Sequence, residues 1–489
     1  MLGLFGVMSG LCYYLLVSVA LIPNWALIYD VKGTKYGGPL TWPSKLLGLR
    51  HLPATYRTLL FVLLMVALSC LWLGAIYLVR RDTRRALTAV IATAFGVFAL
   101  LFVFAPVFMS RDIFSNIFFG RAMTVYHANP FLLIPHARQG DVFYPLIGWK
   151  YNASVYGPVF NYLSWLVTKL AGNSVAANVL GFKVMTFAFY AACLPMVYWL
   201  TRRLTPGKEN MALLITACCP ILVMHTLGGA HNDIIAVAVV LAGYILYRKG
   251  YLLSGIAIVM VAVMVKIVAV FALAPMLVLY VRDKRGAPLK RVIAAGAACV
   301  GVAVLLYLPF LKNLKIFKTT SHMSGMYSAS SIPRVFTWLY AKVFGSGGAA
   351  SSRLQLTANS RVHLVFLGIA GILGILLLLG VKDYRSMTLC AGSLVLVWFL
   401  TSTYVVPWYL ALGLALAALT GWNATTGALV AAATIFTLYP MVGHLGVPLL
   451  VVLVIWTAIF GSSELKKLRW HSRKRAVRGQ QEELDGEEA

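Results

Sequence analysis

The chain has 489 residues, of which 61% are hydrophobic and only 11% are charged, and its formal net charge is +28. Soluble domains are about half apolar and about a quarter charged, so this composition excludes an ordinary soluble protein. The basic residues gather at the ends of apolar runs and in the tail segment ELKKLRWHSRKRAVRGQ. This pattern indicates membrane topology and contact with anionic lipid headgroups, and no nucleic acid partner is expected.

Apolar runs of about 20 residues, the length a helix needs to cross a bilayer, recur from end to end. The sequence therefore predicts an all-α polytopic transmembrane bundle of about 13–14 spans. The run 251–281 is broken near Lys266 and fits two short spans or a re-entrant pair, whereas the shorter run 156–170 is expected to be interfacial or re-entrant. The other expected spans are 4–28, 57–79, 86–109, 175–200, 210–228, 231–247, 291–311, 361–381, 386–403, 406–420, 423–440 and 445–461.

The short basic connections set the expected orientation, because Lys and Arg gather in cytoplasmic loops. If 156–170 does not cross, alternation of the spans places all these connections on one side. They are RRDTRR (80–85), TRRLTPGK (201–208), YRKG (247–250), VRDKRGAPLKR (281–291) and VKDYR (381–385). We therefore expect a multi-pass plasma (inner) membrane protein with both termini cytoplasmic. Its transmembrane domain covers 1–462, and a basic, then acidic, tail without a fixed fold covers 463–489.

The opposite, outer face collects the long loops, which in compact proteins are usually functional. Any carboxylate chemistry there must use Asp30, Asp112, Asp141 or Asp233. The loop 312–360 contains Lys315, Lys318, Arg334, Lys342 and Arg353 but no acid. This loop either binds an anionic ligand or only touches headgroups.

The segment SRDIFSNIFFGRAMTVYHANPF, residues 110–131, places Arg111 and Asp112 side by side after an apolar run. On a helix, Asp112, Ser115 and Asn116 share one face and apolar residues share the other. Such a helix would lie along the outer interface with its carboxylate toward a cavity. The alternative is an interfacial anchor whose Asp112 caps the helix N-terminus.

Two further polar groups interrupt the apolar runs. In GGAHND (228–233), a Gly pair permits a tight turn, and the three residues after Ala230 either cap the next helix or form the rim of a sugar site. Lys266 lies inside an apolar run, where an ionisable residue is expensive and indicates function unless it snorkels. Lys183, near the outer end of a span, is expected to snorkel.

These elements together resemble a known family. Asp112, the Gly120–Arg121 pair and Asn129-Pro130-Phe131 are followed by VYGPVF (155–160), GGAHND, the Lys266 span and PWY (407–409). The set resembles membrane-integral C-fold (GT-C) glycosyltransferases of the bacterial polyprenyl-phosphate-mannose-dependent type, over roughly residues 90–420. Relatives often carry an acid before the Gly-Arg pair, where this chain has Phe119, so no second carboxylate beside Asp112 and no metal site are expected.

The resemblance implies a hexosyltransferase that needs no cofactor. It would move a hexose, with mannose preferred, from a polyprenyl-phosphate-linked donor to a lipid or glycan acceptor at the periplasmic or extracellular face. In this inverting transfer Asp112 is the expected base. Cations must stabilise the leaving phosphate, and aromatic side chains can stack on sugars. The residues expected to bind substrate are Arg111, Arg121, Asn129, Tyr156, His231, Asn232, Asp233, Lys266, His322, Arg334, Trp408 and Tyr409.

Two alternatives remain at this point. A transporter or flippase of lipid-linked saccharide also needs about a dozen spans and polar groups at membrane depth. Against it, the polar residues gather on one face and no internal repeat is evident. The other alternative is a transferase of the same fold that uses another sugar, such as aminoarabinose onto lipid A, or a protein acceptor.

Overall fold

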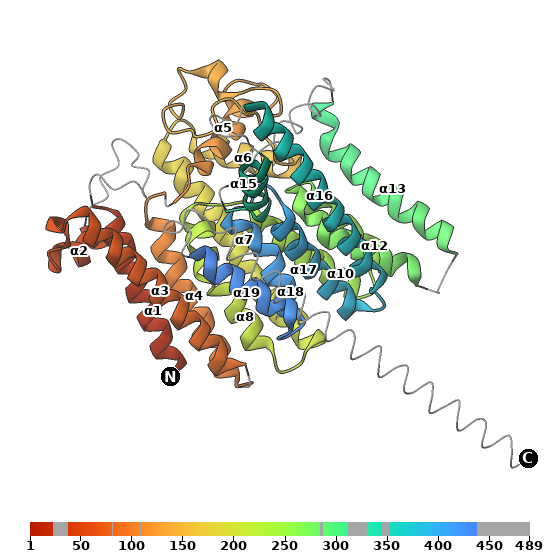
Figure 1. Cartoon of the computed structure of the whole chain (residues 1–489), viewed down its shortest axis with the longest axis horizontal. Coiled ribbons are helices and arrows are strands. Elements are labelled where there is room, and N and C mark those ends of the chain that lie inside the picture. The colour runs from red at the N-terminus through yellow and green to blue at the C-terminus, as the bar shows by residue number, and fades with distance from the viewer. Residues whose placement is uncertain are drawn as a thin grey trace, which may run out of the picture.

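The computed structural model describes residues 1–22, 38–80, 82–107, 109–283, 287–311, 328, 330–344 and 352–437. Every regular element in this part of the chain is helical, as the sequence predicts (Figure 1). The longer helices are α1 (Leu2–Ala20), α3 (Ala54–Val79), α4 (Arg85–Phe104), α5 (Asp112–Thr124), α6 (Pro158–Ala171), α7 (Val175–Leu204), α10 (Asp233–Arg248), α11 (Leu252–Val263), α12 (Val270–Arg282), α13 (Pro288–Tyr307), α15 (Ile332–Phe344), α16 (Ser352–Leu379), α17 (Tyr384–Thr401) and α19 (Ala424–Thr437). The shorter elements are α2 (Trp42–Leu46), α8 (Glu209–Ala217), α9 (Pro220–Leu222), the π-helix η4 (Val223–Gly228), α18 (Leu410–Leu419) and the 3₁₀ turns η1 (Gly38–Thr41), η2 (Leu49–His51), η3 (Pro135–Arg138), η5 (Ile267–Ala269), η6 (Leu308–Phe310) and η8 (Pro407–Tyr409).

Within the described residues, seven helices are long and apolar enough to cross a membrane. An eighth span results if the pair Glu209–Ala217 and Pro220–Gly228, bent by 41°, counts as one. Four more apolar helices have only 10–17 residues, so fewer full-length spans are present in this part than the expected 13–14. The reason is that Lys266 and the polar turns cut apolar runs into helices too short to cross alone. The expected span 445–461 and the tail 463–489 lie outside the described residues.

The basic connections meet at one end of the bundle, as the sequence predicts. Hydrogen bonds at this end join Lys208 to Arg80, Asn210 to Arg84, Thr205 to Leu419, Arg385 to Thr420 and Arg282 to Leu379. We call this end of the bundle the basic end. In Figure 1 it lies below, around α8, while α5 and α6 lie at the top. That the basic end faces the cytoplasm stays a prediction.

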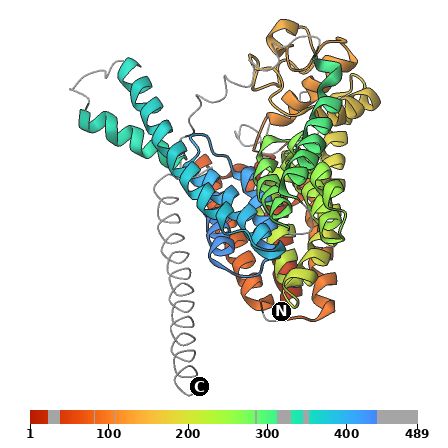
Figure 2. The same cartoon turned by 90° about the vertical axis from the view of Figure 1, so that its right-hand side faces the viewer.

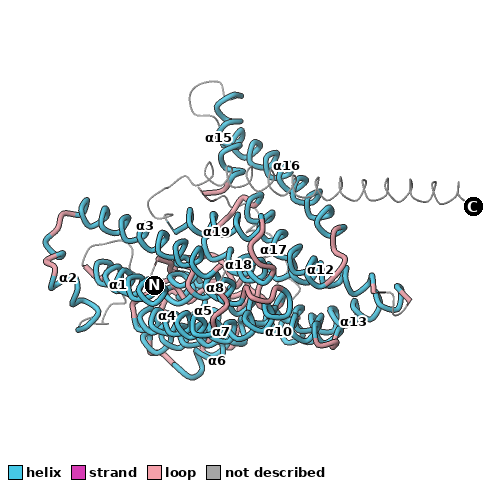
Figure 3. The backbone as a smooth tube through the Cα atoms, turned by 90° about the horizontal axis from the view of Figure 1, so that it is seen from below, coloured by secondary structure: helices cyan, strands magenta, loops and turns pink. Residues whose placement is uncertain are grey.

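The centre of the bundle is formed by its most buried helices. Every residue of α18 is buried, as is every residue of α8 after Glu209. Viewed from below in Figure 3, these two helices and α17 occupy the middle, with α2 and α13 toward opposite sides. Figure 2 shows α15 and α16 extending away from the rest of the bundle. His322, expected to be a donor, lies outside the described residues.

The run broken at Lys266 forms two short helices. Because α11 follows the end of α10 directly and α12 ends at Arg282, both helices begin or end at the basic end, with Lys266 at the break between them. Each is about 18–20 Å long at 1.5 Å per residue, shorter than the hydrocarbon core of about 30 Å. The break leaves Lys266 beside the first turn of α10, where its Nζ lies 2.7 Å from Asp233 Oδ2.

The segment before α6 makes this break possible. The amides of Gly157 and Val159 donate to the carbonyls of Val265 and Met264, which α11 leaves free at its end. Unpaired carbonyls are costly in a membrane, so the contact stabilises the interruption. A Cβ on Gly157 would overlap the Met264 carbonyl, which explains the glycine in VYGPVF.

Helix α5 packs closely on α6. A Cβ on Gly120 would overlap the Ser164 carbonyl, so the glycine before Arg121 permits this approach. The packing buries the apolar face of α5, including Ile113, Phe114 and Ile117. The opposite face is free to line a cavity, as the amphipathic pattern predicts.

The prediction that Lys183 snorkels is wrong. Its side chain is 0% exposed, and Nζ donates to three carbonyls at the end of α4: Phe102 at 2.8 Å, Ala105 at 2.6 Å and Pro106 at 3.0 Å. The negative end of the helix dipole favours a cation at this place. These hydrogen bonds hold α7 against the end of α4, a few residues before Asp112 in the chain.

Candidate active site

Asp112 is the first residue of α5, and its carboxylate faces a cavity. Oδ1 accepts a hydrogen bond from Trp149 Nε1 at 2.9 Å, and Oδ2 lies 3.9 Å from His231 Nδ1. The helix N-cap is Arg111, and no side-chain capping hydrogen bond is present. The capping alternative for Asp112 is therefore not what the structure shows.

The electrostatic surroundings of Asp112 set its basicity. Burial raises the pKa of the Asp112 carboxyl, while the Trp149 hydrogen bond and the positive charge of Lys266 oppose this rise. A base is more effective as its pKa approaches the working pH, so burial favours proton transfer to this group. The Trp149 bond keeps the carboxylate in one orientation.

Lys266 and Asp233 form a buried ion pair across the cavity from Asp112. Nζ lies 2.7 Å from Asp233 Oδ2 and 3.4 Å from Asn232 Oδ1. It also lies 4.8 Å from the ring centroid of Tyr409 and 5.6 Å from that of Tyr156. An ammonium group has three N–H donors, so one can still reach a ligand.

The GGAHND turn places His231 between Asp112 and an aromatic wall. The imidazole stacks on Trp408 with ring centroids 3.6 Å apart and an interplanar angle of 17°. The turn follows η4, and Ala230 within it has a φ of 51°, a left-handed conformation that costs free energy in a non-glycine residue. Asn232 is the N-cap of α10 but makes no side-chain capping hydrogen bond. The polar triplet therefore contributes to the cavity cluster and not to a helix cap.

The cavity has a volume of about 260 Å³. Its walls come from distant parts of the chain: α5, the segment 149–156, the Lys266 break and the segment 404–409. Five of the residues expected from the sequence line it directly, namely Asp112, Tyr156, Lys266, Trp408 and Tyr409. His231, Asn232 and Asp233 contact these residues, so the structure brings together eight of the residues expected from the sequence.

Several buried polar atoms around the cavity have no hydrogen-bond partner. They are Ser115 Oγ, Asn116 Oδ1, His231 Nε2 and Asn232 Nδ2. An unpartnered buried polar group costs roughly 1–3 kcal/mol. Such groups beside a cavity indicate a polar ligand that completes their hydrogen bonding.

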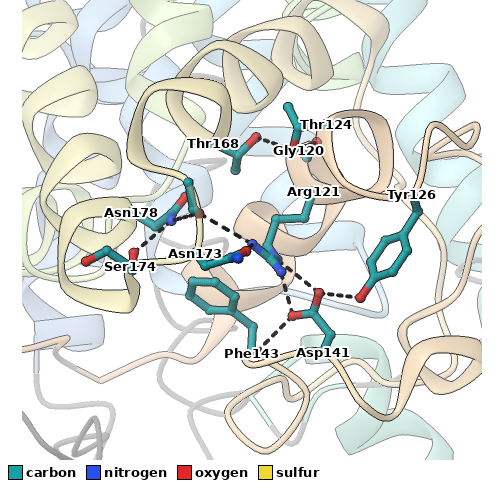
Figure 4. A network of polar contacts seen from close by, with 11 residues as sticks. Gly120, Arg121, Thr124, Tyr126, Asp141, Phe143, Thr168, Asn173, Ser174 and Asn178 are labelled. Carbon is teal, nitrogen blue, oxygen red and sulfur yellow. Dashed lines mark hydrogen bonds and ion pairs between the residues drawn. The ribbon is translucent and has the colours of Figure 1, made fainter.

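Arg121, near the end of α5, belongs to a separate network of polar contacts with Asp141 and Asn173 (Figure 4). Its Nε lies 2.9 Å from Asp141 Oδ2, and its Nη1 donates to Asn173 Oδ1 at 2.9 Å. The Tyr126 hydroxyl donates to the same Asp141 oxygen at 2.7 Å. Arg121 does not line the cavity, and its expected role in substrate binding stays a prediction.

Three other expected residues also stand apart from the cavity lining. Asn129 Nδ2 donates to the Phe310 carbonyl at 3.2 Å, and its Oδ1 accepts from the Phe131 amide, so it shapes the loop. Arg334 lies in the first turn of α15 and Arg111 at the start of α5; neither side chain lines the cavity.

Sequence reasoning missed Trp149 and His225. Trp149 lies in a loop without a periodic pattern, and only its contact with Asp112 identifies it. His225 lies in η4, with its ring centroid 5.1 Å from that of Trp408. A histidine inside the apolar run LVMHTLGG was a signal that could have found it. Among the described residues, no three His, Cys, Asp or Glu side chains are grouped closely enough to hold a metal ion.

Comparisons with known proteins agree on one family. A family model described as "Alpha-(1->6)-mannopyranosyltransferase, N-terminal domain" matches residues 33–282, which include Asp112, Trp149 and Lys266. The alpha-(1->6)-mannopyranosyltransferase A of Mycobacterium tuberculosis is 31% identical over 221 residues, 43% of this chain and 41% of that protein. The protein of the same name from Corynebacterium glutamicum is 27% identical over 175 residues, 35% of each chain. The chain thus spans less than half the length of the curated relatives it matches.

Proposed function

Because this chain belongs to the alpha-(1->6)-mannopyranosyltransferase family, we propose that it transfers a mannosyl residue from a polyprenyl-phosphate-linked donor to a glycan or glycolipid acceptor. The family membership rests on the match over residues 33–282 of 489. The single observation that carries the proposal is the Asp112 carboxylate, which is partly buried, oriented by Trp149 and open to a cavity. A base in that setting suits the activation of an acceptor hydroxyl.

The chemical step is a single displacement at C1 of the donor sugar. The acceptor oxygen forms the new bond to C1 as its proton passes to Asp112. The bond from C1 to the phosphate oxygen breaks, and its electron pair leaves with the polyprenyl phosphate. Configuration at C1 inverts, so a β-linked donor gives the α linkage that the relatives' names describe. No proton is needed on the leaving group, because a phosphate departs as an anion.

We assign to Lys266 the role of stabilising the departing phosphate. Its third N–H donor is not used by Asp233 or Asn232, and a charge-assisted hydrogen bond to phosphate is stronger than a neutral one. Next to it, Ile267 is 71% exposed and also lines the cavity. In a bilayer this apolar side chain would face lipid, which suits a donor whose phosphate enters the cavity while its polyprenyl chain stays in the membrane. The cavity borders the Lys266 break, which lies at the ends of α11 and α12 that point away from the basic end. If the basic end faces the cytoplasm, the reaction therefore takes place at the outer face.

The test is sugar transfer by purified protein in lipid nanodiscs. Radiolabelled polyprenyl-phosphate mannose serves as donor and octyl α-(1→6)-mannobioside as acceptor, with wild type compared with Asp112→Asn. We expect Asp112→Asn to reduce the rate about 10²–10⁴-fold, the usual contribution of a positioned base. The control is Asp82→Asn, a partly exposed residue at the basic end, which should transfer at the wild-type rate. An active Asp112→Asn would contradict the assignment of the base, and an inactive wild type would contradict the proposed function.

A further inference from the structure

Two polar side chains, Ser115 and Asn116, lie buried beside the cavity one turn along from Asp112. Ser115 is 2% exposed and Asn116 is 1% exposed, and both line the cavity. Ser115 Oγ and Asn116 Oδ1 have no hydrogen-bond partner. A buried helical serine usually bonds the carbonyl four residues earlier, but Ser115 does not.

Their place on α5 relates them directly to the base. Residues three and four positions apart on a helix lie on one face, with Cβ atoms about 5–6 Å apart. Asp112, Ser115 and Asn116 therefore form a row of oxygen-bearing groups along one wall. Hydroxyls on one sugar ring are separated by distances of the same order. Lys266 contributes to the cavity from the break between α11 and η5 and not from α5.

We propose that Ser115 and Asn116 bind ring hydroxyls of the acceptor sugar whose nucleophilic hydroxyl faces Asp112. This inference rests on the proposed function and adds to it a subsite that selects the acceptor. The Asn116 carbonyl oxygen accepts a hydrogen bond from one hydroxyl, and the Ser115 hydroxyl donates to or accepts from another. The acceptor is the partner in question because only its hydroxyl must touch Asp112, while the phosphate of the donor belongs beside Lys266.

The chain offers a matched control for this subsite. Ser164 on α6 is also buried, at 0% exposure, and its Oγ also has no partner, but it does not line the cavity. Removal of an unpartnered buried hydroxyl costs the fold little, so Ser115→Ala and Ser164→Ala should both keep the wild-type unfolding temperature. The two variants should differ only in their affinity for the acceptor sugar.

The experiment measures steady-state kinetics in nanodiscs with octyl α-(1→6)-mannobioside and polyprenyl-phosphate mannose. Loss of one hydrogen bond should raise the acceptor KM about tenfold in Ser115→Ala and in Asn116→Ala. The donor KM and the rate at saturating acceptor should stay at wild-type values, and Ser164→Ala should change nothing. A raised donor KM with an unchanged acceptor KM would overturn the proposal, as would equal effects of Ser115→Ala and Ser164→Ala.

Acceptor analogues sharpen the result. A series of mannobiosides, each lacking one ring hydroxyl of the terminal mannose, is tested against wild type and both variants. With wild type, one analogue should have an acceptor KM about tenfold higher than that of the parent mannobioside. With Ser115→Ala, the KM of this analogue should equal that of the parent, because the same hydrogen bond is already absent. If every analogue raised the acceptor KM by the same factor in the variants as in wild type, the proposed subsite would be overturned.

A binding measurement separates this inference from the proposed function. If wild type transfers no mannose, the proposed function fails, but calorimetric titration of the mannobioside without donor still tests the subsite. About tenfold weaker binding by Ser115→Ala than by Ser164→Ala would support it. Equal affinities, or no binding to wild type, would overturn it.

Discussion

Two buried ion pairs in this protein have the same chemistry but different surroundings. Arg121 and Asp141 are 2.9 Å apart. The Tyr126 hydroxyl donates to Asp141, and Asn173 Oδ1 accepts from the Arg121 guanidinium, so both members of the pair have further partners (Figure 4). Lys266 and Asp233 are 2.7 Å apart, but they border a cavity whose walls carry unpartnered polar atoms.

The difference teaches that charge alone does not identify a functional site in a membrane protein. Both pairs are ionisable groups in apolar surroundings, and both pass as functional by that rule. What distinguishes them is the state of the hydrogen bonds around them. A network whose hydrogen bonds are complete stabilises the loop around Arg121 and Asp141, whereas an incomplete network beside a cavity is prepared for a ligand.

The largest expected effect comes from breaking the network of hydrogen bonds around Arg121 and Asp141. Asp141→Asn leaves the Arg121 guanidinium buried without a counter-charge, and loss of one partner of a buried pair costs about 3–5 kcal/mol of stability. Thermal unfolding in detergent should show the loss directly. Asp82→Asn, which breaks the exposed pair with Arg84, should leave the unfolding temperature unchanged. Equal stability of the two variants would contradict the role of the network.

The next effect removes the charges of the cavity pair together. Lys266→Met combined with Asp233→Leu replaces the pair by apolar side chains of similar size, which is often neutral for stability. The double variant should unfold near the wild-type temperature. Its transfer rate should fall about 10²–10³-fold, the usual cost of losing one donor to a developing anion. A double variant that transfers at the wild-type rate would show that Lys266 does not serve the leaving phosphate.

The smallest effect concerns the orientation of the base. Trp149→Phe removes the N–H that lowers the pKa of Asp112, so that pKa should rise further above its ordinary value. The base acts only when deprotonated, and its rate rises with pH through this pKa. The acid limb of the rate profile should therefore move to higher pH, with most of the plateau rate kept. Trp72→Phe, whose indole donates to the Leu214 carbonyl away from the cavity, is the matched control and should leave the limb in place.

The sequence predicted the helical class, and five of the residues expected from it line the cavity, because rare residues carry the signal. Asp112, GGAHND and Lys266 interrupt apolar runs, and few such interruptions occur in this chain. The partners of these residues were harder to find. Trp149 lies 37 residues beyond Asp112 in an aperiodic loop, so no spacing rule connects them.

The same reason explains the errors. Lys183 bonds carbonyls 77–81 residues away, and backbone acceptors leave no trace in a sequence. Arg121 and Asp141 are 20 residues apart, and no spacing rule predicts their pairing. Packing of α5 on α6 and the break at Lys266 depend on close contacts that only the structure displays.

The most direct test of the whole account compares Asp112→Asn with Asp141→Asn in one preparation series. Both substitutions remove one carboxylate charge, and both residues lie in the region between α4 and α6. Unfolding temperature and transfer rate per folded protein are measured for each. The account predicts that Asp112→Asn folds normally but transfers mannose about 10²–10⁴-fold more slowly than wild type, whereas Asp141→Asn unfolds at lower temperature while its folded fraction remains active. The reverse pattern, with an active Asp112→Asn and a stable, inactive Asp141→Asn, would contradict it.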